Sequence, residues 1–148
     1  MNKLSLSLVF LISLSLVSCE KAIKGTGHIV SETRSLEPFN ELELNGIINA
    51  SFKQVKSTDL DKVVVSAQEN LLPYIKTTLD NGRLIINIER SIHTDKKVLV
   101  EIYGHPFRSL VNNGSGDVKS DERLVLQKLY LESNGSGDVS LDLDAKSI

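Results

Sequence analysis

The sequence Asn-Gly-Ser-Gly-Asp-Val at residues 113–118 returns unchanged at residues 134–139, which is 21 positions later in a chain of 148 residues. Leu110 maps onto Leu131 under the same displacement. Periods of about 20 to 50 residues are typical of solenoids and other repeat arrays. A unit this short has no room for two helices and a turn, but it fits two or three short strands joined by glycine-rich corners. The repeat therefore predicts a parallel β-helix in which each coil of about 21 residues stacks on the last.

Apolar residues alternate with polar ones through most of the chain after His28, which predicts strands with one buried face. The alternating sets are Leu42 and Leu44, Val63 and Val65, Ile86 and Ile88, Val98, Val100 and Ile102, Leu129 and Leu131, and Leu141 and Leu143. Helix is nearly absent, because the single candidate helical turn, residues 69–72, is followed by Pro73. The pair Asn81-Gly82 predicts an antiparallel hairpin, since both central residues of a type I′ turn need a positive φ.

The composition of the repeat suits stacked coils. Asn113 above Asn134, and Ser115 above Ser136, can hydrogen-bond along the coil axis as polar ladders do in stacked sheets. Aliphatic ladders can build the core, which agrees with an aromatic content of only 5%. The glycines are expected to allow corner conformations that a Cβ would oppose; they are Gly114, Gly116, Gly135 and Gly137.

The amino terminus has the pattern of a lipoprotein signal. Lys3 precedes a run, residues 4–17, in which only the serines are polar. This run is too short to span a bilayer, which takes about 20 apolar residues. Leu-Val-Ser-Cys at residues 16–19 then looks like the lipobox of bacterial lipoproteins, in which the cysteine thiol accepts the lipid. Cys19 is the single cysteine of the chain, so we expect it to be lipidated and to become the mature first residue.

These patterns divide the chain into three expected segments. Residues 1–18 form the signal peptide, residues 19–27 the lipidated cysteine and a glycine-containing tether, and residues 28–148 the β-helical domain. The lipid on Cys19 would hold the protein on a membrane. We therefore expect a cell-envelope location, at the outer membrane and facing either the periplasm or the cell surface.

Charge and residue counts exclude several classes of function. The formal net charge is −2, so the chain has no basic field for a nucleic acid. With Cys19 committed to lipid, neither a disulfide nor a cysteine nucleophile is available. His28, His93 and His105 are scattered and are expected to be surface imidazoles, so we expect no metal and no cofactor. The chain also lacks the Gly-x-Ser-x-Gly elbow of serine hydrolases, and its glycine-rich turns lack the lysine of a phosphate loop.

Several of these segments together resemble a known family. The lipobox, residues 42–50, residues 68–75, the Asn81-Gly82 turn and the repeated Gly-Ser-Gly-Asp are similar to the "putative auto-transporter adhesin, head GIN domain" family of Bacteroidetes-type bacteria, over about residues 25–148. The resemblance implies a right-handed parallel β-helix, no catalytic residues and a part in cell adhesion. Family members usually carry more Gly-Ser-Gly-Asp coils, so we expect a domain truncated at its carboxyl end with an unpaired edge.

Asp117 and Asp138 would project from equivalent corners of adjacent coils, which brings two like charges together. Either the two carboxylates are solvated and cap backbone N–H groups of their own turns, or a hard cation such as Ca²⁺ bridges them. The first arrangement is favoured because it needs nothing else. Melting with added Ca²⁺ or with EDTA distinguishes the two, because a bound ion raises the midpoint by mass action.

The sequence thus predicts a non-catalytic envelope lipoprotein with an adhesin-like domain. Its expected partners are the membrane, through Cys19, and a glycan or cell-surface protein outside it. The exposed edges of the repeated turns are the candidate contact surface: Asn113, Ser115, Asp117, Asn134, Ser136 and Asp138.

Two alternatives from other classes remain open. A β-helix groove suits extended sugars, so a polysaccharide lyase or glycosidase-like enzyme is one of them. It would need a carboxylate cluster or a base flanked by basic residues, and Asp95-Lys96-Lys97 is the only local concentration of charge. The other alternative is a structural module that assembles end to end through its open coil.

Overall fold

The computed structural model describes residues 20–146, whose regular secondary structure is almost entirely β-strand. Cys19 and the expected signal peptide lie outside these residues. The elements are β1 (Ile23–Lys24), β2 (Ile29–Ser35), β3 (Glu41–Asn45), β4 (Ile48–Gln54), β5 (Lys62–Gln68), the 3₁₀ turn η1 (Leu72–Tyr74), β6 (Ile75–Asp80), β7 (Arg83–Ile88), β8 (Ile92–His93), β9 (Val98–Gly104), β10 (Ser109–Asn112), β11 (Val118–Ser120), β12 (Leu124–Leu126), β13 (Tyr130–Ser133), β14 (Val139–Ser140) and β15 (Leu143–Ala145).

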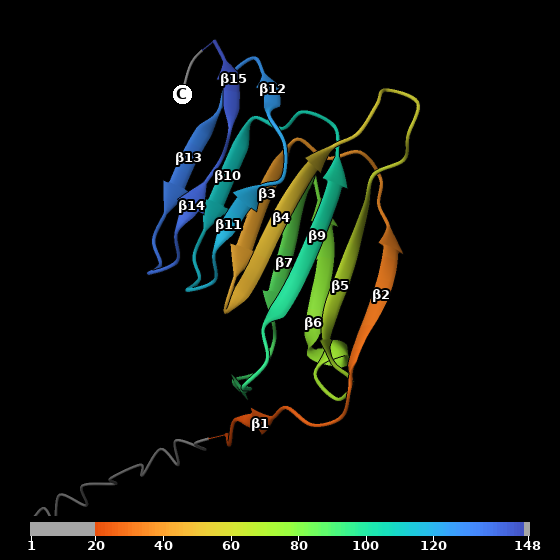
Figure 1. Cartoon of the computed structure of the whole chain (residues 1–148), viewed down its shortest axis with the longest axis vertical. Helices are drawn as coiled ribbons and strands as arrows, with labels where there is room; N and C mark the ends of the chain where they lie inside the picture. Colours follow the sequence, from red (N-terminus) through yellow and green to blue (C-terminus); the bar gives the residue numbers. More distant parts are fainter. Residues whose placement is uncertain (1–19, 147–148) are drawn as a thin grey trace, which may run out of the picture.

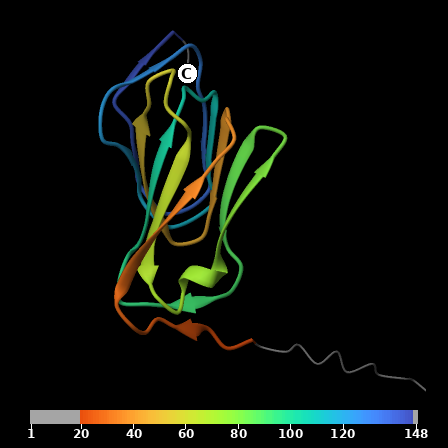
Figure 2. The same cartoon turned by 90° about the vertical axis from the view of Figure 1, so that its right-hand side faces the viewer.

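Two mixed sheets face each other and enclose the core (Figures 1 and 2). One has five strands in the order β13-β10-β3-β7-β6, and the other has six in the order β14-β11-β4-β9-β5-β2. Two short parallel pairs, β1 with β8 and β12 with β15, lie outside these sheets. Figure 2 shows the two main sheets as separate layers, with β1 crossing below them.

The sheet order contradicts the expected right-handed parallel β-helix, which is wrong as a description of this domain. Strand β5 runs antiparallel to both β2 and β9, and β6 runs antiparallel to β7. Strands that follow one another in the chain also do not form successive coils, because β3 lies between β7 and β10 in one sheet and β4 lies between β9 and β11 in the other. The physical reason is that the 21-residue repeat relates only the last two layers. Asn45 and Asn113, which belong to the neighbouring strands β3 and β10, are 68 positions apart.

Two narrower expectations are confirmed. Strands separated by 21 positions do pair in parallel, with Leu110 opposite Leu131 in β10 and β13, and Val118 opposite Val139 in β11 and β14. The Asn81-Gly82 turn does join an antiparallel hairpin, β6 to β7. Its two residues have φ values of 49° and 80°, both in the region that a type I′ turn needs.

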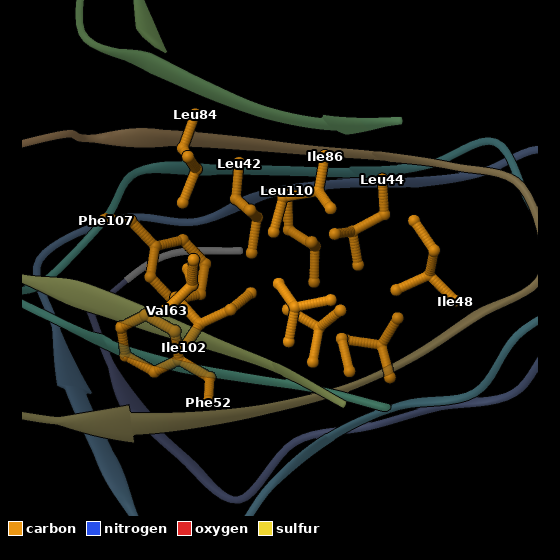
Figure 3. Packing of buried hydrophobic residues seen from close by; sticks show 14 of the residues in the cluster. Leu42, Leu44, Ile48, Phe52, Val63, Leu84, Ile86, Ile102, Phe107 and Leu110 are labelled. Carbon is orange, nitrogen blue, oxygen red and sulfur yellow. The ribbon is translucent and has the colours of Figure 1, made fainter. Parts of the chain in front are cut away.

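Alternation along each strand builds the core from aliphatic rows. Leu84, Leu42 and Leu110 are in register across the five-stranded sheet, and all three are buried. Phe52 and Phe107 meet edge to face with ring centroids 4.7 Å apart, which adds the one buried aromatic pair of residues 20–146. Figure 3 shows these side chains pointing into the space between the two sheets. Burial of each large aliphatic side chain contributes about 1.5 to 3 kcal/mol.

The glycines of the repeated turns serve close stacking, which corrects the reason given from the sequence. A Cβ at Gly114 would overlap the carbonyl oxygen of Gly46, and one at Gly135 would overlap that of Gly114. Gly114 and Gly135 do not have positive φ values; Gly46 does, at 112°. The turn at Gly46 therefore belongs to the same stack of turns, as a third layer that the sequence repeat does not reveal.

Part of the segment expected to be a tether is held against the domain. The backbone N–H of Ile23 donates to the carbonyl oxygen of Ser91 at 2.8 Å, within the parallel pair of β1 and β8. The side chain of Asn70 donates to the carbonyl oxygen of Lys24 at 2.8 Å and accepts from the N–H of Thr26 at 2.7 Å.

Within residues 20–146, the structure contains no helix that is long and apolar enough to cross a membrane.

Candidate ligand-binding face

The outer face of the five-stranded sheet carries the most organised set of polar side chains. Because side chains alternate along a strand, the leucines of β3, β7 and β10 point inward and their neighbours point to solvent. Parallel register then aligns the outward residues in rows across the strands. Part of this face is hollowed into a depression of about 690 Å³, which Asn113 lines and which Asn45 and Asn134 do not. We call this surface the amide face, and its members are Glu41, Asn45, Asn113, Tyr130, Glu132 and Asn134.

A column of asparagine side chains crosses the amide face at the point where the strands enter their turns. The side-chain amide of Asn134 donates to Oδ1 of Asn113 at 2.9 Å, and that of Asn113 donates to Oδ1 of Asn45 at 2.9 Å. Asn45 donates in turn to Glu43 at 3.0 Å. The expected pairing of Asn113 with Asn134 is therefore confirmed, and the column is one residue longer than the repeat predicts.

Glu132 is fixed from both sides. The phenolic O–H of Tyr130 donates to Oε2 of Glu132, and the amide of Asn134 donates to Oε1 at 2.7 Å. The hydrogen bond from Tyr130, followed by the one from Asn134, lowers the pKa of Glu132 below its ordinary value. The hydrogen bond to Glu132 also raises the pKa of Tyr130. Glu132 is therefore a carboxylate at neutral pH, and the Tyr130 ring is held with 55% of its surface exposed.

Glu41 anchors two arginines at the rim of the depression. Nε of Arg83 donates to Oε2 of Glu41 at 3.0 Å, and Nη2 of Arg108 donates to Oε1 at 2.8 Å. The hydrogen bonds from Arg83 and then from Arg108 lower the pKa of Glu41. Arg83 also lies 3.6 Å from Glu43. The acidic and basic side chains of this region thus neutralise one another.

The residues predicted to form one contact surface lie on different sides of the stacked turns. Asn113 and Asn134 belong to the amide face, whereas Asp117 lines a separate depression on the outer face of the six-stranded sheet. Asp138 follows Asp117 in the neighbouring layer, and Ser115 and Ser136 are exposed at the turns between the sheets. The structure brings the two asparagines together but does not join all six residues in one site.

Asp117 caps a backbone N–H, but the N–H belongs to the next layer instead of its own turn. The N–H of Asp138 donates to Oδ1 of Asp117 at 3.2 Å. One layer earlier, the N–H of Asp117 lies 3.5 Å from Oδ1 of Asn49. Asn49 therefore holds, in its layer, the position that Asp117 holds in the next. Within residues 20–146, no three His, Cys, Asp or Glu side chains are arranged to hold a metal ion.

Several members of the amide face were not found from the sequence. Asn45 was missed because its turn, Asn-Gly-Ile-Ile-Asn-Ala at residues 45–50, shares only the first two letters with the repeat and lies 68 positions before it. Asn49 and Asp117 hold the same place in the two turns. This correspondence is a weak signal, which appears only when the turns are aligned without requiring identical residues. Tyr130 and Glu132 were missed because the sequence does not repeat them.

One histidine differs from its expected surface position. His28 and His93 are exposed, but Nδ1 of His105 lies 2.6 Å from Oδ1 of Asp61, whose side chain is completely buried. Oδ2 of Asp61 is the one buried side-chain oxygen without a hydrogen-bond partner among the described residues. This pair joins the loop before β5 to the loop after β9.

Residues 38–148 match the family model described as "Putative auto-transporter adhesin, head GIN domain". The chain belongs to this family. The resemblance stated from the sequence is therefore confirmed, and the amide face is a feature of a head GIN domain. A search of curated proteins gave no match.

Solved structures share the fold of this head GIN domain. A protein described as a putative adhesin from Bacteroides fragilis is 21% identical, with a TM-score of 0.73 over 86% of this chain and 62% of its own. A putative adhesin from Parabacteroides merdae is 18% identical, with a TM-score of 0.70 over 85% of this chain and 56% of its own. A protein described as a putative lipid binding protein from Parabacteroides distasonis is 20% identical, with a TM-score of 0.74 over 86% and 55%. The chain therefore spans less than two thirds of the length of each, and the likeness shows the fold alone.

Proposed function

We propose that this protein is a lipid-anchored protein of the cell envelope whose head GIN domain binds a ligand at or beyond the cell surface without transforming it. Family membership supports an adhesin-like role. The observation that carries the proposal is the amide face, where hydrogen bonds hold Asn113, Asn134 and Glu132 in place before any ligand arrives. Pre-ordered side chains lose little conformational entropy on binding.

The pKa shifts of Glu41 and Glu132 do not suit a general acid. A general acid that works near neutral pH needs a pKa raised toward that range. Glu41 and Glu132 have lowered pKa values, because arginines surround the first and Tyr130 and Asn134 donate to the second. These carboxylates are suited to accept hydrogen bonds from a ligand, not to protonate a leaving group.

The anchor in this proposal is Cys19, at the end of the lipobox. Because β1 begins at Ile23, a lipid on Cys19 would keep the domain close to its membrane. Cell fractionation tests the anchor: Cys19→Ala should move the protein from the membrane pellet to the soluble fraction, and Cys19→Ser should do the same. Retention of both variants in the pellet, with no lipid label on the wild type, would overturn it.

Ligand binding is tested with the full chain in nanodiscs, labelled and added to whole cells. The wild type should bind, and Asn113→Ala should reduce binding while it leaves the melting temperature within a few degrees. Asp117→Ala and Asp138→Ala test separately whether the side of the turns away from the amide face also contacts the ligand. Absence of binding by the folded wild type to any cell type offered would contradict the proposed function.

A second candidate function, end-to-end self-association, is favoured by the last layer of strands. Among the described residues, no strand pairs with the outer edges of β13, β14 and β15. Leu131, which continues the buried leucine row, is 41% exposed there. An edge of this kind is a template for pairing with another chain. Sedimentation that depends on protein concentration would support assembly, and a constant monomer mass would exclude it.

A further inference from the structure

The spacing of the asparagine column suggests what kind of ligand lies on the amide face. Asn134, Asn113 and Asn45 come from adjacent strands, so the column advances by one strand spacing, about 4.8 Å, per residue. This step is close to the span of one pyranose ring. A polymer of sugars lying across the strands would therefore meet a similar set of groups at each step.

Asn45 and Asn113 keep both a donor and an acceptor for a ligand, whereas Asn134 gives both of its N–H groups to Asn113 and Glu132 and keeps only an acceptor. An asparagine side chain has two N–H donors and two acceptor lone pairs. The bonds between neighbours in the column use one donor and one acceptor of Asn113, which leaves one of each for a ligand. Hydroxyl groups, which donate and accept at the same atom, match this pattern better than groups that only donate or only accept.

Tyr130 adds an aromatic platform on β13, two residues before Glu132 and four residues before the Asn134 end of the column. Its ring is 55% exposed, and the hydrogen bond to Glu132 fixes its orientation. A tyrosine ring presents an apolar surface at low entropic cost, with polar groups around it. The C–H face of a sugar ring can stack on such a surface while its hydroxyls reach Glu132, and the next sugar can reach Asn134.

The charge of the face indicates an uncharged ligand. Three carboxylates, Glu41, Glu43 and Glu132, line the depression together with three cations, Arg83, Arg108 and Lys128. Glu41 is paired with both arginines, and Arg83 also approaches Glu43. The region thus has no unbalanced charge for an anion or a cation, and its complement is a neutral molecule rich in hydroxyl groups.

We propose that the amide face binds a neutral oligosaccharide, which stacks one sugar on Tyr130 and runs past Glu132 to the asparagine column. The proposal rests on the proposed function, because it names the ligand class of the same surface. Longer neutral chains should bind more tightly than disaccharides of the same sugar until the column is covered. Acidic chains of equal length should bind more weakly, since they gain no compensating charge.

The test is an array of neutral and acidic oligosaccharides probed with the full chain in nanodiscs, followed by calorimetric titration of each neutral chain that binds. Tyr130→Ala should weaken binding by about tenfold or more. Tyr130→Phe keeps the ring and should cost much less. Tyr103→Ala is the matched control, because Tyr103 lies on the outer face of the other sheet, under Lys62 at 4.8 Å. It should leave the affinity unchanged.

Three results overturn the inference: binding of no neutral chain, preference for acidic chains, or equal affinities for the wild type and Tyr130→Ala. The whole-cell assay separates this failure from failure of the proposed function. Cell binding that survives enzymatic removal of surface glycans and is lost after protease treatment would assign a protein ligand. The proposed function would then stand and the oligosaccharide would not.

Discussion

At Gly114 a hydrogen atom in place of a side chain lets two layers of backbone touch. A Cβ there would overlap the backbone of Gly46, which cannot turn aside as a flexible side chain can. Gly114→Ala should therefore lower the free energy of unfolding by at least about 2 kcal/mol. Ser115→Ala, one residue later and exposed, is the control and should change it little. Urea unfolding measures both, and equal stabilities would contradict the close-stacking account.

The pair formed by the buried Asp61 and the half-buried His105 is a second residue-scale feature. His105→Ala should destabilise the fold by about 2 to 3 kcal/mol, because it leaves the buried Asp61 carboxylate without its partner. Adding Asp61→Asn removes that charge, so the double variant should be more stable than His105→Ala alone. A double-mutant cycle in urea decides the point, and additive losses would show that the two side chains do not interact.

At the scale of strands, the sequence predicted direction only where a repeat or a turn motif marked it. Identical letters at residues 113–118 and 134–139 predicted the register of the last two layers, and Asn81-Gly82 predicted the β6–β7 hairpin. The alternation of Val63 and Val65 predicted a strand with one buried face, but alternation is the same in parallel and antiparallel strands. The antiparallel pairing of β5 with β9 was therefore not predicted.

The candidate site was partly predictable for a related reason. Asn113 and Asn134 could be found because the repeat marks them, but Glu41, Arg83 and Tyr130 come from elements that share no motif. They meet because Tyr130 pairs with Ser109, Ser109 with Glu41 and Glu41 with Arg83 across four strands. Only the order of the strands in the sheet reveals that row.

The contacts of Glu41 with Arg83 and Arg108 predict how the stability of the fold changes in acid. Because the folded-state pKa of Glu41 is below the ordinary value of 4.5, its contacts with Arg83 and Arg108 stabilise the fold above that value and are lost as the pH falls through the folded-state pKa. The melting temperature of Glu41→Gln should fall below that of the wild type near about pH 7, and the gap should close near about pH 3. A gap that is constant or widens in acid would contradict this sign.

At the scale of the whole molecule, the two ends of the stack differ. At one end Arg34 of β2 donates to the carbonyl oxygen of Ile75 at 2.7 Å and to the hydroxyl of Thr77 at 2.8 Å, so a side chain ties the edges of the two sheets together. At the other end, β13 and β14 form the outermost layer of the described chain, and Leu131 and Tyr130 are exposed (Figure 1). Among the described residues, a side chain therefore ties the two sheets together at the β2 end, and the strands of the β13 end have no further partner.

This asymmetry predicts the order in which backbone amides exchange with solvent. Strands β4 and β9 have neighbours on both sides, so their amides should exchange slowest, while those of β13 and β14 should exchange at least about tenfold faster. Arg34→Ala should accelerate exchange in β2 and leave β13 unchanged, because the tie it removes lies at the far end. Hydrogen–deuterium exchange with mass spectrometry resolves these segments. Slow exchange in β13 of a monomer would mean that the open edge is stable by itself, whereas slow exchange that appears only at high protein concentration would mean that another copy covers it.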